Sequence, residues 1–143
     1  MIRTLTAAIM MASLAACSSV PLGAPEQDSA LKTFRPVDGK TALYIYRNEF
    51  MAPGIRMDVL VNGVEIGSTT AKTYLYAELP PGRHQITSKA EDNHTILFDA
   101  VPGQVAYVWQ EVKMGGWYAR SKLQLVDEET GQAGVKECKL AVR

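Results

Sequence analysis

Apolar and polar positions alternate with a period of two through most of the chain after residue 40. In residues 41–46, Leu43 and Ile45 fall on one face, and Tyr44 and Tyr46 fall on the other. Alternation of this kind, in a segment rich in β-branched and aromatic residues, is typical of a β-strand. Because both sets are apolar, the pattern predicts a strand with two apolar faces.

Turn dipeptides separate this segment from further predicted strands. Asn62-Gly63 is the strongest short-range signal of a hairpin, because a type I′ turn needs positive φ at both central positions. Pro81-Gly82 supplies the fixed φ and then the positive φ of a type II turn. Residues 104–112 form the longest predicted strand. The other predicted strands are 57–61, 64–66, 72–79, 84–88, 96–98, 123–125 and 138–142.

Regularly spaced turns between short strands predict an all-β fold, an antiparallel β-sandwich of about seven to nine strands. Helical signals are weak. Residues 28–34 fit a single helical turn with Asp28 as N-cap. The acidic run Asp127-Glu128-Glu129, followed by Gly131 and Gly134, predicts a solvated connection.

The first 16 residues have a different character. Arg3 is followed by a run over residues 5–16 that is apolar apart from Thr6 and Ser13. A membrane-spanning helix needs roughly 20 apolar residues, so this run is too short to stay in a bilayer. It predicts a cleaved signal peptide over residues 1–16.

Leu14-Ala15-Ala16-Cys17 resembles the lipobox of bacterial lipoproteins. The resemblance implies acyl chains such as palmitate on Cys17, which would attach the protein to a membrane. Since Ser18 stands where an Asp often retains such proteins in the inner membrane, it implies an outer-membrane location on the periplasmic side. The inner membrane and the cell surface are the less favoured locations. The alternative is an ordinary secretory cleavage after Ala16 that leaves Cys17 as a free thiol.

Residues 17–38 contain Pro21, Gly23 and Pro25 and show no hydrophobic period over their first half. Such a composition is typical of a flexible linker. The chain is therefore divided into a signal peptide, a lipidated Cys17 with its tether, and one β-sandwich domain over residues 39–143.

Three motifs follow one another along the chain: Tyr44-Ile45-Tyr46-Arg47, Val61-Asn62-Gly63 and Pro81-Gly82-Arg83-His84. This order is similar to that in a family of bacterial lipoproteins whose domain has no assigned function. The hairpin followed by Pro-Gly-x-His also resembles the PEGA-type small β-sandwich of envelope proteins. These resemblances imply a fold and a location, with no catalytic residue to carry over.

Charge and cysteine content narrow the function classes. Without residues 1–16, 127 residues remain, with 14 Lys plus Arg against 15 Asp plus Glu. A balance of about −1 gives no electrostatic footprint for nucleic acid. If Cys17 carries lipid, Cys138 has no partner for an intramolecular disulfide. Cys138 is expected to be a small buried hydrophobe, and a reactive or intermolecular thiol is the alternative.

Known catalytic and metal-binding patterns are missing from the sequence. His84 is expected to pack at the start of a strand and His94 to be exposed in a loop; Glu91 and Asp92 between them do not complete a convincing metal site. A G-x-S-x-G elbow and a phosphate-binding glycine loop are also missing. We therefore predict no metal, no cofactor and no enzymatic activity.

Aromatic residues are the remaining candidates for ligand binding. Trp109, Trp117 and Tyr118 flank the Gly115-Gly116 loop. Exposed, they could stack on sugar rings or anchor a protein partner; the alternative is that they fill the core.

The expected function is a non-enzymatic binding or accessory module of the cell envelope, with an envelope protein or peptidoglycan as partner. A glycan-active or other periplasmic hydrolase, with a site scattered along the strands, is the alternative. A third interpretation is an assembly subunit with an unpaired edge strand.

Overall fold

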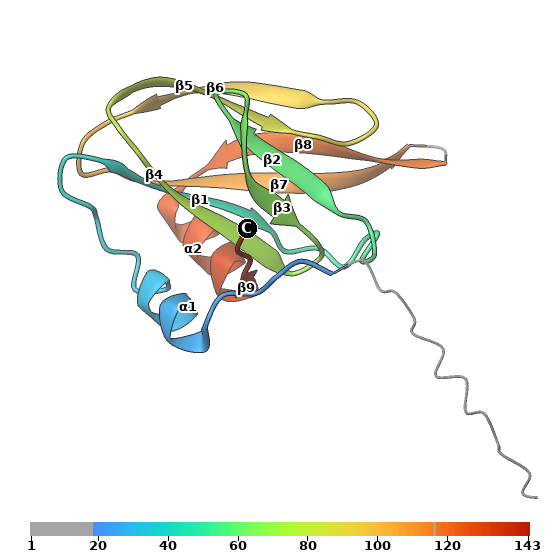
Figure 1. The fold of residues 1–143 in the computed structure, drawn as a ribbon, viewed down its shortest axis with the longest axis horizontal. Coiled ribbons are helices and arrows are strands. Elements are labelled where there is room, and N and C mark those ends of the chain that lie inside the picture. The colour runs from blue at the N-terminus through green and yellow to red at the C-terminus, as the bar shows by residue number, and fades with distance from the viewer. Residues whose placement is uncertain (1–18, 116) are drawn as a thin grey trace, which may run out of the picture.

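The computed structural model describes residues 19–115 and 117–143, and it forms two stacked β-sheets with two helices on the outer face of one of them (Figure 1). The all-β sandwich is confirmed. The five-stranded sheet has the order β8 (Tyr118–Val126), β7 (Val105–Gly115), β1 (Thr41–Arg47), β4 (Thr73–Leu79) and β9 (Lys139–Leu140). The four-stranded sheet has the order β3 (Val64–Thr69), β2 (Met57–Val61), β5 (Gly82–Ser88) and β6 (His94–Ala100).

The predicted hairpin turn at Asn62-Gly63 is present, and Gly82 has the positive φ expected of it, although it is the first residue of β5. Asn62 and Gly63, between β2 and β3, have φ of 52° and 79°, as a type I′ turn requires. Gly82 has φ of 122°. Strand β7 has 11 residues and is the longest of the described strands. Its hairpin with β8 is tight, because Gly115 pairs directly with Tyr118.

Two strand pairs are parallel, which differs from a purely antiparallel sandwich. β1 pairs with β7 in parallel, and β4 pairs with β9 in parallel. In both cases the later strand arrives by a crossover, β7 from the other sheet and β9 from helix α2 (Glu128–Lys136). Crossovers allow parallel pairing, whereas a tight hairpin requires antiparallel strands. The remaining pairs are antiparallel.

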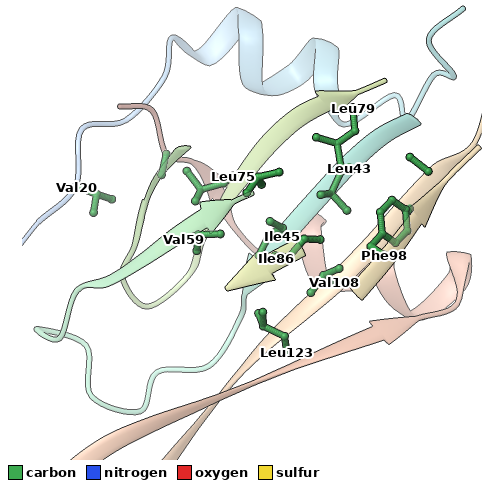
Figure 2. Packing of buried hydrophobic residues seen from close by; sticks show 14 residues of the cluster. Val20, Leu43, Ile45, Val59, Leu75, Leu79, Ile86, Phe98, Val108 and Leu123 are labelled. Carbon is green, nitrogen blue, oxygen red and sulfur yellow. The ribbon is translucent and has the colours of Figure 1, made fainter. Parts of the chain in front are cut away.

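Strand β1 is buried on both faces, as its sequence predicts. Leu43 and Ile45 point between the sheets and belong to the sandwich core (Figure 2). Tyr44 and Tyr46 point to the outer face and belong to a second core. Both helices cover this outer face, so the described chain has a helical layer, a five-stranded sheet and a four-stranded sheet.

The prediction of a solvated connection after residue 126 was wrong, because helix α2 begins there. Asp127 caps it by accepting a hydrogen bond from the backbone N–H of Thr130 over 2.7 Å. Gly131 and Gly134 lie one turn apart on its buried face, where a Cβ atom would overlap the rings of Tyr107 and Tyr46. The glycines therefore permit close packing on the sheet and do not mark a loop.

The prediction of a flexible tether over residues 17–38 was also wrong for residues 19–38, the part that the structure describes. Helix α1 spans Pro25–Leu31, so it begins earlier than predicted and its N-cap is Ala24. Asp28 lies inside the helix, where it accepts a hydrogen bond from the hydroxyl of Tyr74 over 2.6 Å. Leu22 forms a β-bridge with Ala141. The segment lies along the domain because Val20 packs in the sandwich core and Leu22 pairs with the C-terminal segment. Its Pro and Gly residues therefore do not make it a free linker.

Candidate functional site

The loop over residues 48–56, between β1 and β2, is fixed by hydrogen bonds from a buried arginine. Arg47 has 0% of its surface exposed, and its guanidinium donates to the carbonyl oxygens of Ile55 (2.6 Å), Ala52 (2.7 Å) and Met51 (3.1 Å). Burial lowers the pKa of Arg47, an effect that the nearby carboxylate of Glu49 opposes. The planar fork with several donors suits this cluster of carbonyls.

A second contact fixes the same loop to strand β7. Glu49 accepts a hydrogen bond from the backbone N–H of Val112 over 2.8 Å. Burial raises the pKa of Glu49, and this hydrogen bond acts in the opposite direction. Ala52 packs on a small apolar cluster that includes Val112 and Ala119. The loop and the ends of β7 and β8 therefore form one connected surface.

Large apolar side chains project from this surface into solvent. We call it the apolar tip and define it by six residues: Phe50, Met51, Ile55, Met114, Trp117 and Tyr118. Trp117 is 95% exposed, Phe50 is 74% exposed and Tyr118 is 58% exposed. An aromatic side chain in this position is available to a partner and contributes little to the core.

A hollow of about 500 Å³ opens beside the tip. Trp117 and Tyr118 line it together with Ile55, and Arg56 and Lys89 line it as well. The hollow also contains the carboxylates of Asp58 and Glu91, and Asp58 accepts a hydrogen bond from Ser68 at 2.5 Å. An aromatic wall with a mixed-charge rim is typical of a binding surface.

Trp109 lies six residues before Gly115 on β7, away from the hairpin end, so the three predicted aromatic residues do not form one site. It is half-buried against the outer core, beside helix α2. It lines a separate hollow of about 280 Å³ with Tyr46, Asn48 and Gly134. Its indole N–H has no hydrogen-bond partner among the described residues. Distance along the strand explains the separation, because Trp109 pairs with Gln124, whereas Tyr118 pairs with Gly115 at the hairpin end, about 20 Å further along β7.

The side chains of both histidines form hydrogen bonds within the fold. His84 is 7% exposed; its Nδ1 lies 2.9 Å from the side-chain nitrogen of Asn62 and its Nε2 lies 2.7 Å from the carbonyl oxygen of Pro80. A neutral ring with the proton on Nε2 satisfies both contacts. The expected packing of His84 is confirmed. His94 was expected to be exposed, but it begins β6, half-buried, and accepts from the N–H of Leu123 over 2.9 Å.

Cys138 is a free thiol with 2% of its surface exposed. Burial raises its pKa to about 12, which keeps the thiol protonated near neutral pH. This placement supports the interpretation of Cys138 as a buried small hydrophobe. Within residues 19–115 and 117–143, no three His, Cys, Asp or Glu side chains gather in a group that could hold a metal ion.

The start of the described chain lies near the apolar tip. Ser19 lines a hollow of about 340 Å³ with Lys72 and Glu137, whose charged groups are 3.7 Å apart. The ammonium of Lys72 also lies 5.0 Å from the ring centroid of Phe50. In Figure 1 the blue start of the ribbon and the loop between β1 and β2 lie on the same side of the molecule. The predicted lipidation site, Cys17, lies outside the described residues.

Sequence reasoning missed Arg47, Glu49 and the exposed loop that they organise. The one available signal was a charged residue at the end of a strand that is otherwise apolar on both faces, which indicates a buried charge with polar partners. Phe50 and Met51 gave no sequence signal, because a single apolar residue in a loop is common.

The fold and this surface define a small β-sandwich with one helix-covered face and an exposed aromatic end. The chain belongs to the family described as protein of unknown function (DUF2846), which matches residues 37–121. An uncharacterised protein of Haemophilus influenzae (strain ATCC 51907 / DSM 11121 / KW20 / Rd) is 28% identical over 131 residues, which cover 90% of this chain and 78% of that protein. No solved structure matches the chain. The family match includes the loop over residues 48–56 and Trp117, and it leaves α1, α2 and β9 outside.

Proposed function

We propose that this protein is a lipid-anchored envelope protein on the periplasmic side of the outer membrane, where its domain is a non-enzymatic binding or accessory module. The observation that carries the proposal is Leu14-Ala15-Ala16-Cys17 at the end of a short apolar leader. Acyl chains on Cys17 would supply the membrane attachment, since two or more chains hold a protein firmly. None of the described helices has the length and apolar character to cross a bilayer.

The exposed surface supports a binder. The apolar tip presents Phe50 to solvent from a loop that Arg47 and Glu49 hold in place, and it presents Trp117 from the adjoining β7–β8 hairpin. Preorganised aromatic side chains bind partners at a low cost in conformational entropy. The turn pattern that resembles the PEGA-type sandwich of envelope proteins is a further support for this location.

Cell fractionation of the wild type and the Cys17→Ala variant tests the proposal. We expect the wild type in the outer membrane with a fatty-acylated N-terminus, visible by mass spectrometry or labelled palmitate. The Cys17→Ala variant should lose the label and leave the membrane fraction. Equal membrane association of both proteins, or an unmodified Cys17 in the wild type, would contradict the proposal.

Crosslinking in intact cells then separates a binding module from the alternative, a glycan-active or other periplasmic hydrolase. A binding module predicts a specific envelope protein or peptidoglycan adduct that is lost with Cys17→Ala. A hydrolase predicts turnover of purified peptidoglycan that falls in the Asp58→Asn and Glu91→Gln variants, because these carboxylates line the hollow beside Trp117. Such turnover would overturn the non-enzymatic assignment.

A further inference from the structure

The chain leaves almost no slack between Cys17 and the folded domain. Val20 is 7% exposed and belongs to the sandwich core (Figure 2). Val142 donates its backbone N–H to the carbonyl of Pro21 over 2.9 Å. Two residues span at most about 7 Å between Cα atoms, so Cys17 lies within that distance of Ser19. Lipid on Cys17 would therefore hold this side of the domain against the bilayer.

The side that is held there is the side that carries the apolar tip. Ser19 and Lys72 line one hollow, and the ammonium of Lys72 lies 5.0 Å from the ring centroid of Phe50. From Phe50 the loop continues to Ile55, which lines the next hollow together with Trp117. Two hollows, one cation–π contact and the loop between them thus connect the start of the described chain with the β7–β8 hairpin.

The chemistry of the tip suits the interfacial region of a bilayer. Trp and Tyr are enriched at this level of a membrane because they combine an apolar ring with a polar group. Trp117 is 95% exposed and Met114 is 52% exposed, so burial in lipid would remove apolar surface from water. Arg56 and Lys89 line the hollow beside Trp117, where they can meet lipid phosphates, and Asp58 and Glu91 line it as well, so its charges balance.

We propose that the apolar tip inserts into the same membrane leaflet that holds the acyl chains of Cys17, as a second attachment that orients the domain. The inference rests on the proposed function, because the lipid on Cys17 brings the tip to the surface. The occupant of the tip is the interfacial layer of the bilayer.

Fluorescence of the full-length lipidated protein in vesicles tests this contact. The vesicles contain phosphatidylethanolamine and phosphatidylglycerol, with or without brominated acyl chains that quench nearby tryptophan. Trp109 and Trp117 are the two tryptophans of the chain. We expect the Trp109→Phe variant, which retains Trp117, to lose most of its emission in brominated vesicles. The Trp117→Phe variant, which retains Trp109, should emit equally in both kinds of vesicle, because Trp109 lies beside helix α2. Should Trp109→Phe fail to fold, the difference between the wild type and Trp117→Phe reports the same quenching.

A second pair of variants separates the tip from general surface apolarity. Phe50→Ser should reduce the quenching of Trp117, since it removes a neighbouring insertion point. Leu97→Ser is the matched control, because Leu97 is 61% exposed and lines a hollow with Leu125, near the other end of β8. It should leave the quenching unchanged. Equal effects of the two variants would overturn the proposal.

The mass of the purified protein distinguishes failure of this inference from failure of the proposed function. An unmodified Cys17 contradicts the proposed function. A lipidated Cys17 with an unquenched Trp117 overturns the membrane contact alone. If peptidoglycan, and not lipid, quenches Trp117, a glycan is the occupant and the inference is wrong.

Discussion

At the scale of single residues, two glycines determine how closely helix α2 approaches the sheet. A Cβ atom at Gly131 would overlap the ring of Tyr107, and one at Gly134 would overlap the ring of Tyr46. Replacing a glycine inside a helix by alanine normally stabilises the helix by about 1 kcal/mol. Overpacking of a core costs typically about 1–3 kcal/mol or more. The steric term is expected to dominate at both positions.

We predict that Gly131→Ala and Gly134→Ala each lower the free energy of unfolding by about 1–3 kcal/mol, because the tyrosine rings have to move. Urea unfolding measures the change. Gly54→Ala is the control, since a Cβ atom there meets nothing within 4 Å and its φ is not in the left-handed region. If Gly131→Ala and Gly134→Ala lower the free energy of unfolding no more than Gly54→Ala does, α2 does not pack closely on the tyrosine rings.

At the scale of elements, the outer face of the five-stranded sheet is a layer of tyrosines beneath the two helices. Tyr44 stacks on Tyr107 with ring centroids 5.5 Å apart. Burial raises the pKa of Tyr46 and of Tyr76 to about 12, and it raises the pKa of Tyr44 and Tyr74 as well. The folded state therefore keeps these hydroxyls protonated at a pH where the unfolded chain has begun to lose the protons.

This layer predicts a loss of stability at high pH. The folded protein binds more protons than the unfolded chain between the ordinary tyrosine pKa of 10.0 and about 12. Stability is therefore fully present below pH 10 and declines as pH rises through this window. Urea midpoints measured from pH 8 to 12 should show the decline.

Tyr46→Phe is the variant that isolates one member of the layer, because it removes the ionisable hydroxyl and keeps the ring. We expect its midpoint to fall less steeply than that of the wild type above pH 10. A slope identical to that of the wild type would mean that Tyr46 ionises equally in both states.

At the scale of the whole molecule, the two ends of the described chain stabilise each other. Gly23 donates its backbone N–H to the carbonyl of Leu140 over 2.9 Å, and Leu22 bridges Ala141. The family match over residues 37–121 leaves both of these segments outside. They nevertheless pack on the shared domain, since Leu140 is 3% exposed within the outer core.

We predict that Leu140→Ala destabilises the protein by about 2–5 kcal/mol, as expected when a large buried side chain is truncated. It should also speed hydrogen exchange in residues 19–24, because their partner strand loosens. Lys139→Ala, at an exposed neighbouring side chain, is the control and should leave both measurements unchanged. Unaltered exchange in the N-terminal segment would contradict the mutual stabilisation.

Strands and hairpin turns followed from local sequence because their signals are local. The alternation of Leu43 and Ile45 with Tyr44 and Tyr46 depends on the pleat of a single strand, and Asn62-Gly63 depends on the φ values of two residues. The anchor motif ending at Cys17 is likewise a short contiguous pattern, and it remains a prediction.

Only the tertiary structure decided which residues meet across the chain. Helix α2 went unrecognised because Gly131 and Gly134 are poor helix formers, and their value appears only against the tyrosines of β1 and β7. The apolar tip joins a loop after β1 to a hairpin more than 60 residues later, through Glu49 and Val112. Contacts between distant segments depend on packing, and no local pattern encodes them. The same reason explains why residues 19–24, which resemble a linker in composition, fold onto the C-terminal strand.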